Sequence, residues 1–195
     1  MNSSNRLLLL TIAHQSICET LEKKTPYTYM QVKEDPPEEV IHPQGVFVTL
    51  KTKHKDYTSL RGCIGNIEGN RPIYENVYQL AKESAFKDPR FPPLTMKELP
   101  SICIQISILS KLKPISSMDE VILGTHGVVY EYRLHRALFL PEVAVEQKWN
   151  TSRLFGQLCM KASLPPTHWK SGEGTFYVFT TETFEDSRHG SGSAM

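Results

Sequence analysis

The spacing of apolar residues along the chain predicts strands and helices. Residues 46–53 (VFVTLKTK) alternate between apolar and polar, which is typical of a half-buried strand. Residues 59–67 (SLRGCIGNI) follow a polar turn, so the two segments predict a β-hairpin. Residues 102–109 (ICIQISIL) place four isoleucines on one face of a third strand. Shorter strands are expected in HGVVYEYR and RALFLP, and GTFYVFTTETF predicts one last strand.

Spacings of three and four residues predict three main helices. Their expected buried stripes are Leu7, Leu10, His14, Ile17 and Leu21; then Ile73, Val77, Leu80, Ala81, Ser84 and Ala85; and finally Leu154, Phe155, Leu158, Cys159 and Ala162.

Capping residues and prolines indicate where these helices begin and end. Ser3 or Ser4 can cap the first helix, Asn150 can cap the last, and Pro72 marks the start of the second. Pro89 ends that second helix, because it lacks an amide donor. Thr95 and Glu98 have the spacing of a capping box, Pro141 can start a short helix through Glu146, and the proline-rich residues 33–45 predict an extended surface connection.

The order of these elements predicts an α+β fold with a mostly antiparallel sheet, because helices and strands do not alternate as in strict βαβ units. Residues 186–195 contribute no core-forming side chains and are predicted to be a disordered tail.

Composition excludes several classes of protein. A hydrophobic share of 39% and a net charge of +1 argue against a disordered chain and against a dedicated nucleic-acid binder. No apolar run approaches the roughly 18 residues that a membrane span requires. The four cysteines form no C-x-x-C pair, so neither a disulfide framework nor a zinc site is expected, and the chain is predicted to be cytoplasmic. No metal cluster or nucleotide-binding motif indicates a cofactor.

Several segments together resemble the AMMECR domain family: SLRGCIG, SAFKDPRFPPL, GTHGV, LFLPEVAVEQKWN and FYVFTTETF. The resemblance covers about Gly45 to Phe184, and LRGCIG is the hallmark string of the family. Lys148 and Asn150 depart from it, since the family commonly has glycine and aspartate there.

The resemblance implies one domain, residues 1–185, built of two parts. The larger part (about 1–113 and 173–185) would contain both termini, and the smaller part (about 114–172) would pack across a cleft faced by the hallmark segment. Related domains occur fused to, or beside, Memo-like and radical-SAM proteins, which implies a shared pathway.

The hallmark segment supplies the main candidate site. Regular alternation would place Leu60 and Ile64 on the core face, and Arg61 and Cys63 on the face toward the cleft. Gly62 and Gly65 would leave room there for an approaching ligand. A guanidinium beside Cys63 can lower the pKa of the thiol and make it a nucleophile, whereas cysteine is also a common buried packing residue.

Other candidates have structural alternatives. His126 could serve as the base for Cys63 or only hydrogen-bond within its own turn. Glu142 could bind a polar ligand group or interact with a helix dipole. Asp88 and Arg90 could bind an anion or simply lock a rigid corner.

Two classes of function therefore remain open. The sequence favours a binding module for a protein, peptide or other sizeable ligand, because no complete catalytic set is present. The alternative is a cysteine-dependent enzyme that acts on a large substrate, with Cys63 as nucleophile.

Overall fold

The computed structural model describes residues 1–186, which form two compact units. Of the described residues, the first unit contains 1–108 and 183–186, and the second contains Leu109–Glu182. Each unit has its own four-stranded sheet, and the strand pairs β1–β2, β1–β3, β4–β7, β5–β6 and β5–β7 are antiparallel. The predicted α+β class is confirmed. None of the described helices is both long and apolar enough to cross a bilayer.

The first sheet has the order β2-β1-β3-β8, made of β1 (Val46–Lys53), β2 (Thr58–Asn66), β3 (Ile102–Leu109) and β8 (Thr181–Glu185). The predicted hairpin of β1 and β2 is confirmed. Val46, Val48 and Leu50 pair with Ile108, Ile106 and Ile104, and all six side chains are buried. These residues form the core face of the sheet.

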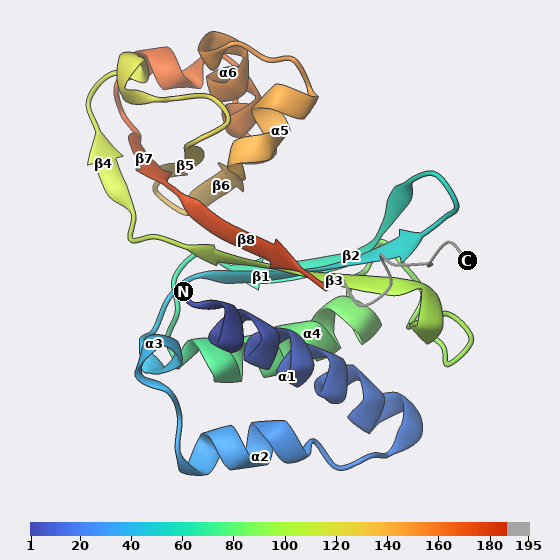
Figure 1. The fold of residues 1–195 in the computed structure, drawn as a ribbon. Coiled ribbons are helices and arrows are strands. Elements are labelled where there is room, and N and C mark those ends of the chain that lie inside the picture. The colour runs from blue at the N-terminus through green and yellow to red at the C-terminus, as the bar shows by residue number, and fades with distance from the viewer. Residues whose placement is uncertain (187–195) are drawn as a thin grey trace. The chain divides into compact units, whose positions relative to one another are not determined.

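Helices cover that core face (Figure 1). α4 (Ile73–Phe86) packs directly on β1 and β2, α1 (Ser3–Glu22) packs on α4, and α2 (Tyr27–Glu34) contacts both helices. All six predicted stripe residues of α4 are buried. A short α3 (Glu38–Ile41) and the 3₁₀ turn η1 (Leu99–Ser101) complete the unit. The end of α2 and the whole of α3 lie within residues 33–45, so the prediction of an extended connection there was partly wrong.

The stripe and cap predicted for α1 were partly wrong. Leu7 is 56% exposed, whereas Leu9, Ile12 and Ala13 are fully buried, because the helix lies between two layers and buries a broader face than one narrow stripe. The N-cap is Asn2, whose side chain accepts a hydrogen bond from the Asn5 amide, so neither Ser3 nor Ser4 has this role.

The second sheet has the order β4-β7-β5-β6, made of β4 (Lys113–Ile115), β5 (Gly127–Tyr132), β6 (His135–Phe139) and β7 (Thr175–Phe179). α5 (Pro141–Glu146) and α6 (Thr151–Lys161) pack on it, with 3₁₀ turns η2 (Met118–Glu120) and η3 (His168–Ser171). The five stripe residues predicted for α6 are all buried. Asn150 caps α6 as predicted, since its side chain accepts from the Arg153 amide at 2.8 Å.

The predicted last strand is in fact two strands in two different sheets. β7 ends at Phe179 and pairs with β4 and β5, whereas β8 begins at Thr181 and pairs with β3. β7 therefore belongs to the second unit, not to the larger part that was expected to resume at residue 173. Alternating apolar residues predict a strand but do not show which sheet it joins. Of the predicted tail, only Asp186 is described, and its amide donates to the Ile104 carbonyl; residues 187–195 lie outside the described part.

Candidate functional site

A β-bulge interrupts the hallmark segment of β2. Leu50 pairs with Gly62, but the next residue of β1, Lys51, pairs with Leu60, so Arg61 has no partner in β1. An extra residue on one strand shifts the alternation of side chains beyond it. Leu60 therefore shares a face with Cys63 and not with Ile64, and it is 44% exposed. The prediction that Leu60 points into the core was wrong.

Arg61 anchors this bulge. Its side chain is buried and donates from Nε to Glu98 Oε1 at 2.7 Å and from Nη2 to the Pro92 carbonyl at 2.9 Å. The bond from Arg61, together with those from Thr95, lowers the pKa of Glu98 to about 2. Glu98 also accepts from the Thr95 amide, which is half of the predicted capping box. Arg61 is thus tied to the segment that contains Pro92 and Glu98, and the expected side-by-side row of Arg61 and Cys63 is not formed.

The chain itself fills the space beside both glycines. A Cβ atom at Gly62 would lie 2.1 Å from the Ser84 carbonyl oxygen, and one at Gly65 would lie 2.2 Å from Cδ1 of Phe47. The Ser84 hydroxyl also accepts from the Ile64 amide at 2.9 Å and donates to the Val48 carbonyl at 2.7 Å, which ties α4 to both strands. The expected room for a ligand is therefore occupied by α4 and by an aromatic ring.

Asp88 and Arg90 hold Cys63 from the edge of the sheet. The buried Asp88 carboxylate accepts from the Cys63 amide at 2.8 Å and from Arg90 Nε and Nη2 at 2.9 and 2.6 Å. Arg90 Nη2 also donates to the Cys63 carbonyl at 3.2 Å. The hydrogen bonds from Arg90, followed by that from Cys63, hold the pKa of Asp88 far below its ordinary value. The cation beside Cys63 is consequently Arg90. The contacts of Asp88 and Arg90 are those of a pair that locks a rigid corner.

Cys63 lies on the face of the sheet opposite the core face. The register aligns Cys63 with Thr49 and Gln105 in one row, and its Sγ lies 3.2 Å from the Thr49 hydroxyl. Adjacent rows complete what we call the Cys63 face: Leu60, Lys51 and Cys103 on one side, and Gly65, Phe47 and Ser107 on the other. Cys63 itself is half-buried. The face combines the thiols of Cys63 and Cys103, the exposed Leu60, the Phe47 ring, the cation Lys51 and neutral polar groups.

The other two candidates lie in the second unit. His126 Nδ1 accepts from the Ile122 amide at 3.2 Å, in a turn where Gly124 has a left-handed φ of 83°. This contact fits the structural alternative for His126. Glu142 is half-buried in the first turn of α5. Its role as a ligand contact, the pairing of His126 with Cys63 and the cleft between the two parts stay predictions. Among residues 1–186, no three His, Cys, Asp or Glu side chains gather as a metal site requires.

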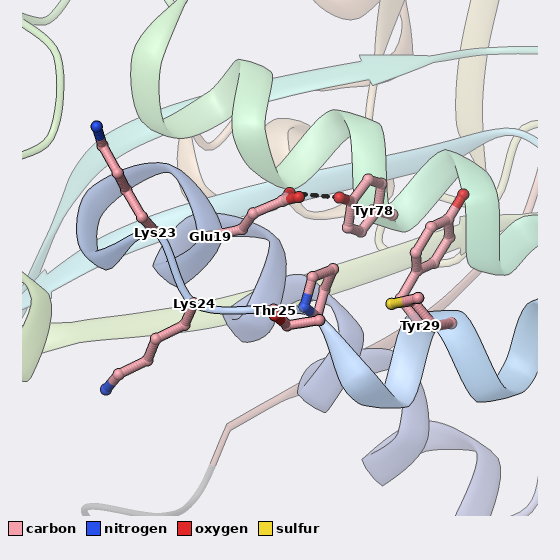
Figure 2. Close-up of a pocket in the computed structure, with 8 residues that line it drawn as sticks. Glu19, Lys23, Lys24, Thr25, Tyr29 and Tyr78 are labelled. Atoms are coloured by element: carbon pink, nitrogen blue, oxygen red, sulfur yellow. Dashed lines mark hydrogen bonds between the residues drawn. The ribbon is translucent and has the colours of Figure 1, made fainter.

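Sequence reasoning missed a cavity of about 460 Å³ in the first unit, where α1 ends and α2 begins (Figure 2). Glu19 and Tyr78 lie on its wall and are hydrogen-bonded to one another, and Lys82 also donates to Glu19. Tyr29 stacks on Tyr78 with ring centroids 3.8 Å apart. Burial, and then the bond to Glu19, raises the pKa of Tyr78. The polar groups of Glu19, Tyr78 and Lys82 thus bond to one another.

Comparison with known proteins agrees with this fold. The crystal structure of an uncharacterized protein from Pyrococcus horikoshii superposes with a TM-score of 0.77 and 30% identity, and the match covers 91% of this chain and 89% of that one. A protein of Methanocaldococcus jannaschii is 37% identical over 161 residues, or 80% of this chain and 79% of that protein. One of Methanopyrus kandleri is 33% identical over 189 residues, covering 91% and 90%.

These likenesses define a shared α+β class of proteins. The family model AMMECR1 matches residues 10–184, and this chain therefore belongs to the AMMECR1 family.

Proposed function

We propose that this protein is a binding module that recognises a protein or peptide segment on the Cys63 face. The observation that supports the proposal is the exposure of Leu60, which the bulge at Arg61 directs away from the core. Because Leu60 is 44% exposed, it forgoes about 1 kcal/mol of the free energy that full burial of a leucine would provide. Bulges next to functional sites commonly re-aim a side chain in this way. An apolar side chain of the partner would recover part of that burial.

The surroundings of Leu60 indicate the chemistry of the partner. The Arg61–Glu98 pair and the Asp88–Arg90 pair hold β2 at the bulge and at Cys63, so the face is rigid before binding. Arg90 exposes 54% of its side chain at the edge of the strand, and the part of its guanidinium that does not bind Asp88 can donate to a carboxylate of the partner. The proposed ligand is a segment that combines an apolar side chain with an acidic residue or a free C-terminus.

A peptide library displayed on phage and panned against the folded protein tests this proposal. Enriched peptides would be synthesised and their affinities measured for wild type, Leu60→Ser and the matched control Leu7→Ser, another exposed leucine of the first unit. We expect Leu60→Ser to weaken binding about tenfold, and Leu7→Ser to leave it unchanged. The proposal is wrong if no peptide is enriched, or if the enriched peptides bind Leu60→Ser as tightly as wild type.

A second function, nucleophilic chemistry at Cys63, is favoured by one observation. Cys63 lies beside the Arg90 guanidinium and is half-buried, whereas burial raises the pKa of the thiols of Cys18, Cys103 and Cys159. A positive charge near a thiol stabilises the thiolate.

Alkylation rates separate the two functions. A nucleophilic Cys63 would react with iodoacetamide faster than the other three cysteines between about pH 6 and 9, and Arg90→Gln would slow it. Circular dichroism would first establish that this variant is folded. Equally slow labelling of all four cysteines in both proteins would exclude the enzyme and leave the binding module.

A further inference from the structure

The second unit contains a cavity of about 380 Å³ on the outer face of α6, away from its buried stripe. One wall is the exposed side of the helix, and the other is the segment that returns along it. The residues of the helix wall are Ser152, Arg153, Gly156, Gln157 and Met160, with Asn150 at the end, and those of the returning segment are Pro166, Thr167, Trp169 and Lys170.

Local backbone geometry forms this cavity. Ser163 takes a left-handed φ of 61° just after α6, where its amide donates to the Met160 carbonyl and the Leu164 amide to that of Cys159. This Schellman motif ends the helix and turns the chain back along it. A Cβ atom at Gly156 would lie 3.3 Å from the Pro166 carbonyl oxygen, so a glycine lets the segment approach.

An aromatic ring fixes the far wall. Trp169 is half-buried and packs edge-on against the buried Phe155, with ring centroids 5.9 Å apart and planes at 79°. Lys170 Nζ lies 5.3 Å from the centroid of the Trp169 ring. Trp169 and the exposed Met160 give the cavity its apolar surface.

The charges of this lining have one sign. Arg153 and Lys170 are its two charged residues, and no Asp or Glu lines the cavity. Across the described part of the chain, neither cation takes part in a salt bridge. Hydroxyl groups of Ser152 and Thr167 add neutral donors. Two exposed cations with hydroxyl donors are suited to a multiply charged oxyanion.

The lining of the cavity in Figure 2 contains charges of both signs. Lys24 forms a salt bridge with Glu22 at 2.7 Å, and the Glu19 carboxylate lies in that lining. The Glu19 carboxylate offsets part of the positive charge of Lys23 and Lys24 and would weaken the attraction of an anion. Of these two cavities, the one beside α6 is better suited to an anionic ligand.

We propose that this cavity binds a small organic phosphate, with the phosphate group between Arg153 and Lys170 and a planar or apolar part against Trp169 and Met160. The volume of about 380 Å³ is in the range of small-molecule sites. The first turn of α6, beside Asn150, adds the positive end of the helix dipole. The site is independent of the Cys63 face, since it lies wholly in the second unit.

Isothermal titration calorimetry with adenosine 5′-monophosphate as the probe tests the proposal. We expect saturable binding with a Kd below about 1 mM. Adenosine, which lacks the phosphate, and citrate, which carries only carboxylates, should each bind at least about tenfold more weakly. Ribose 5-phosphate should fall between the probe and adenosine, because it lacks the planar base.

Variants locate the site. Arg153→Gln and Lys170→Gln should each weaken binding of the nucleotide about tenfold, while Lys111→Gln, an exposed cation of the same unit outside the cavity, should leave it unchanged. All three side chains are exposed, so the folded state should be retained, which near-UV circular dichroism verifies. Absence of binding up to about 1 mM, equal affinity for adenosine or citrate, or equal loss in all three variants would each overturn the proposal.

Discussion

The contacts that hold β2 in the first unit and those that hold α5 and α6 in the second differ in how far apart the bonded residues lie in the sequence. β2 is anchored by Ser84, Asp88 and Glu98, which lie 20, 25 and 37 residues from the groups they bind. The ends of α5 and α6 are closed by residues three to five positions away, as in the bond from the Arg153 amide to Asn150. Short-range contacts follow from the local sequence, whereas long-range anchors can impose a conformation that the local pattern does not encode.

The largest expected effect is that of Gly62→Ala. Its methyl group would collide with the Ser84 carbonyl, so α4 must shift and the first unit should lose about 3 kcal/mol of stability or more. This result would contradict the sequence-based expectation that Gly62 leaves room for an approaching ligand. Urea unfolding followed by far-UV circular dichroism, which reports α1 and α4, measures it.

Gly172→Ala is the matched control for that collision. Gly172 has a φ of 74°, but a Cβ atom there would meet no other atom within 4 Å, so only backbone strain of about 1 kcal/mol is expected. Equal stability of the two variants would show that the close approach of α4 to β2 is not a constraint.

Asp88→Asn should be nearly as damaging. The amide would replace a buried carboxylate that accepts from Cys63 and from the half-exposed Arg90, and losing hydrogen bonds to such a charged group costs about 1.5–3 kcal/mol. Asp56→Asn, on the exposed hairpin turn, should leave the unfolding midpoint unchanged. A small effect of Asp88→Asn would mean that β2 does not depend on its distant anchor.

Acid should weaken the second anchor of β2, the pair of Glu98 and Arg61. The pKa of Glu98 falls from an ordinary 4.5 to about 2 on folding, so its pairing with Arg61 contributes stability above pH 4.5 that is lost as the pH falls toward 2. Wild type and Glu98→Gln should therefore differ most near neutral pH and converge in acid. Urea unfolding at a series of pH values measures both profiles, and parallel profiles would contradict the assignment.

The smallest expected effect is a gain in the second unit. Lys148 follows the end of α5 and has a left-handed φ of 54°. Its amide donates to the Val145 carbonyl, and the amide of Trp149 donates to the Ala144 carbonyl. This is the Schellman position that favours glycine, so Lys148→Gly should stabilise the unit by about 0.5 kcal/mol. Both tryptophans lie in this unit, and their fluorescence during urea unfolding reports the change.

Gln147→Gly provides the contrast at the adjacent position. Gln147 has a helical φ of −84°, so glycine there only adds freedom to the unfolded chain and should destabilise the unit. If both variants shift the midpoint in the same direction, the left-handed conformation of Lys148 is not the cause.

The sequence by itself determined the elements whose physical causes are local. The apolar stripes of α4 and α6, the four buried isoleucines of β3, the β1–β2 hairpin and the Asn150 cap all follow from side-chain spacing within one element or across one short turn. The departure at Lys148 also had a local meaning, because this residue has a left-handed backbone angle that favours glycine.

The tertiary structure alone decided the features that depend on distant partners. Arg61 is buried against Glu98 at the bulge that leaves Leu60 exposed, and Asp88 holds Arg90 beside Cys63. The partner sheets divide the last apolar run at Thr180. A glycine within a strand, such as Gly62, predicts that another group approaches the backbone closely, but it does not identify that group. Here it is the backbone of α4, and only the packing of a helix onto a strand 20 residues away determines that.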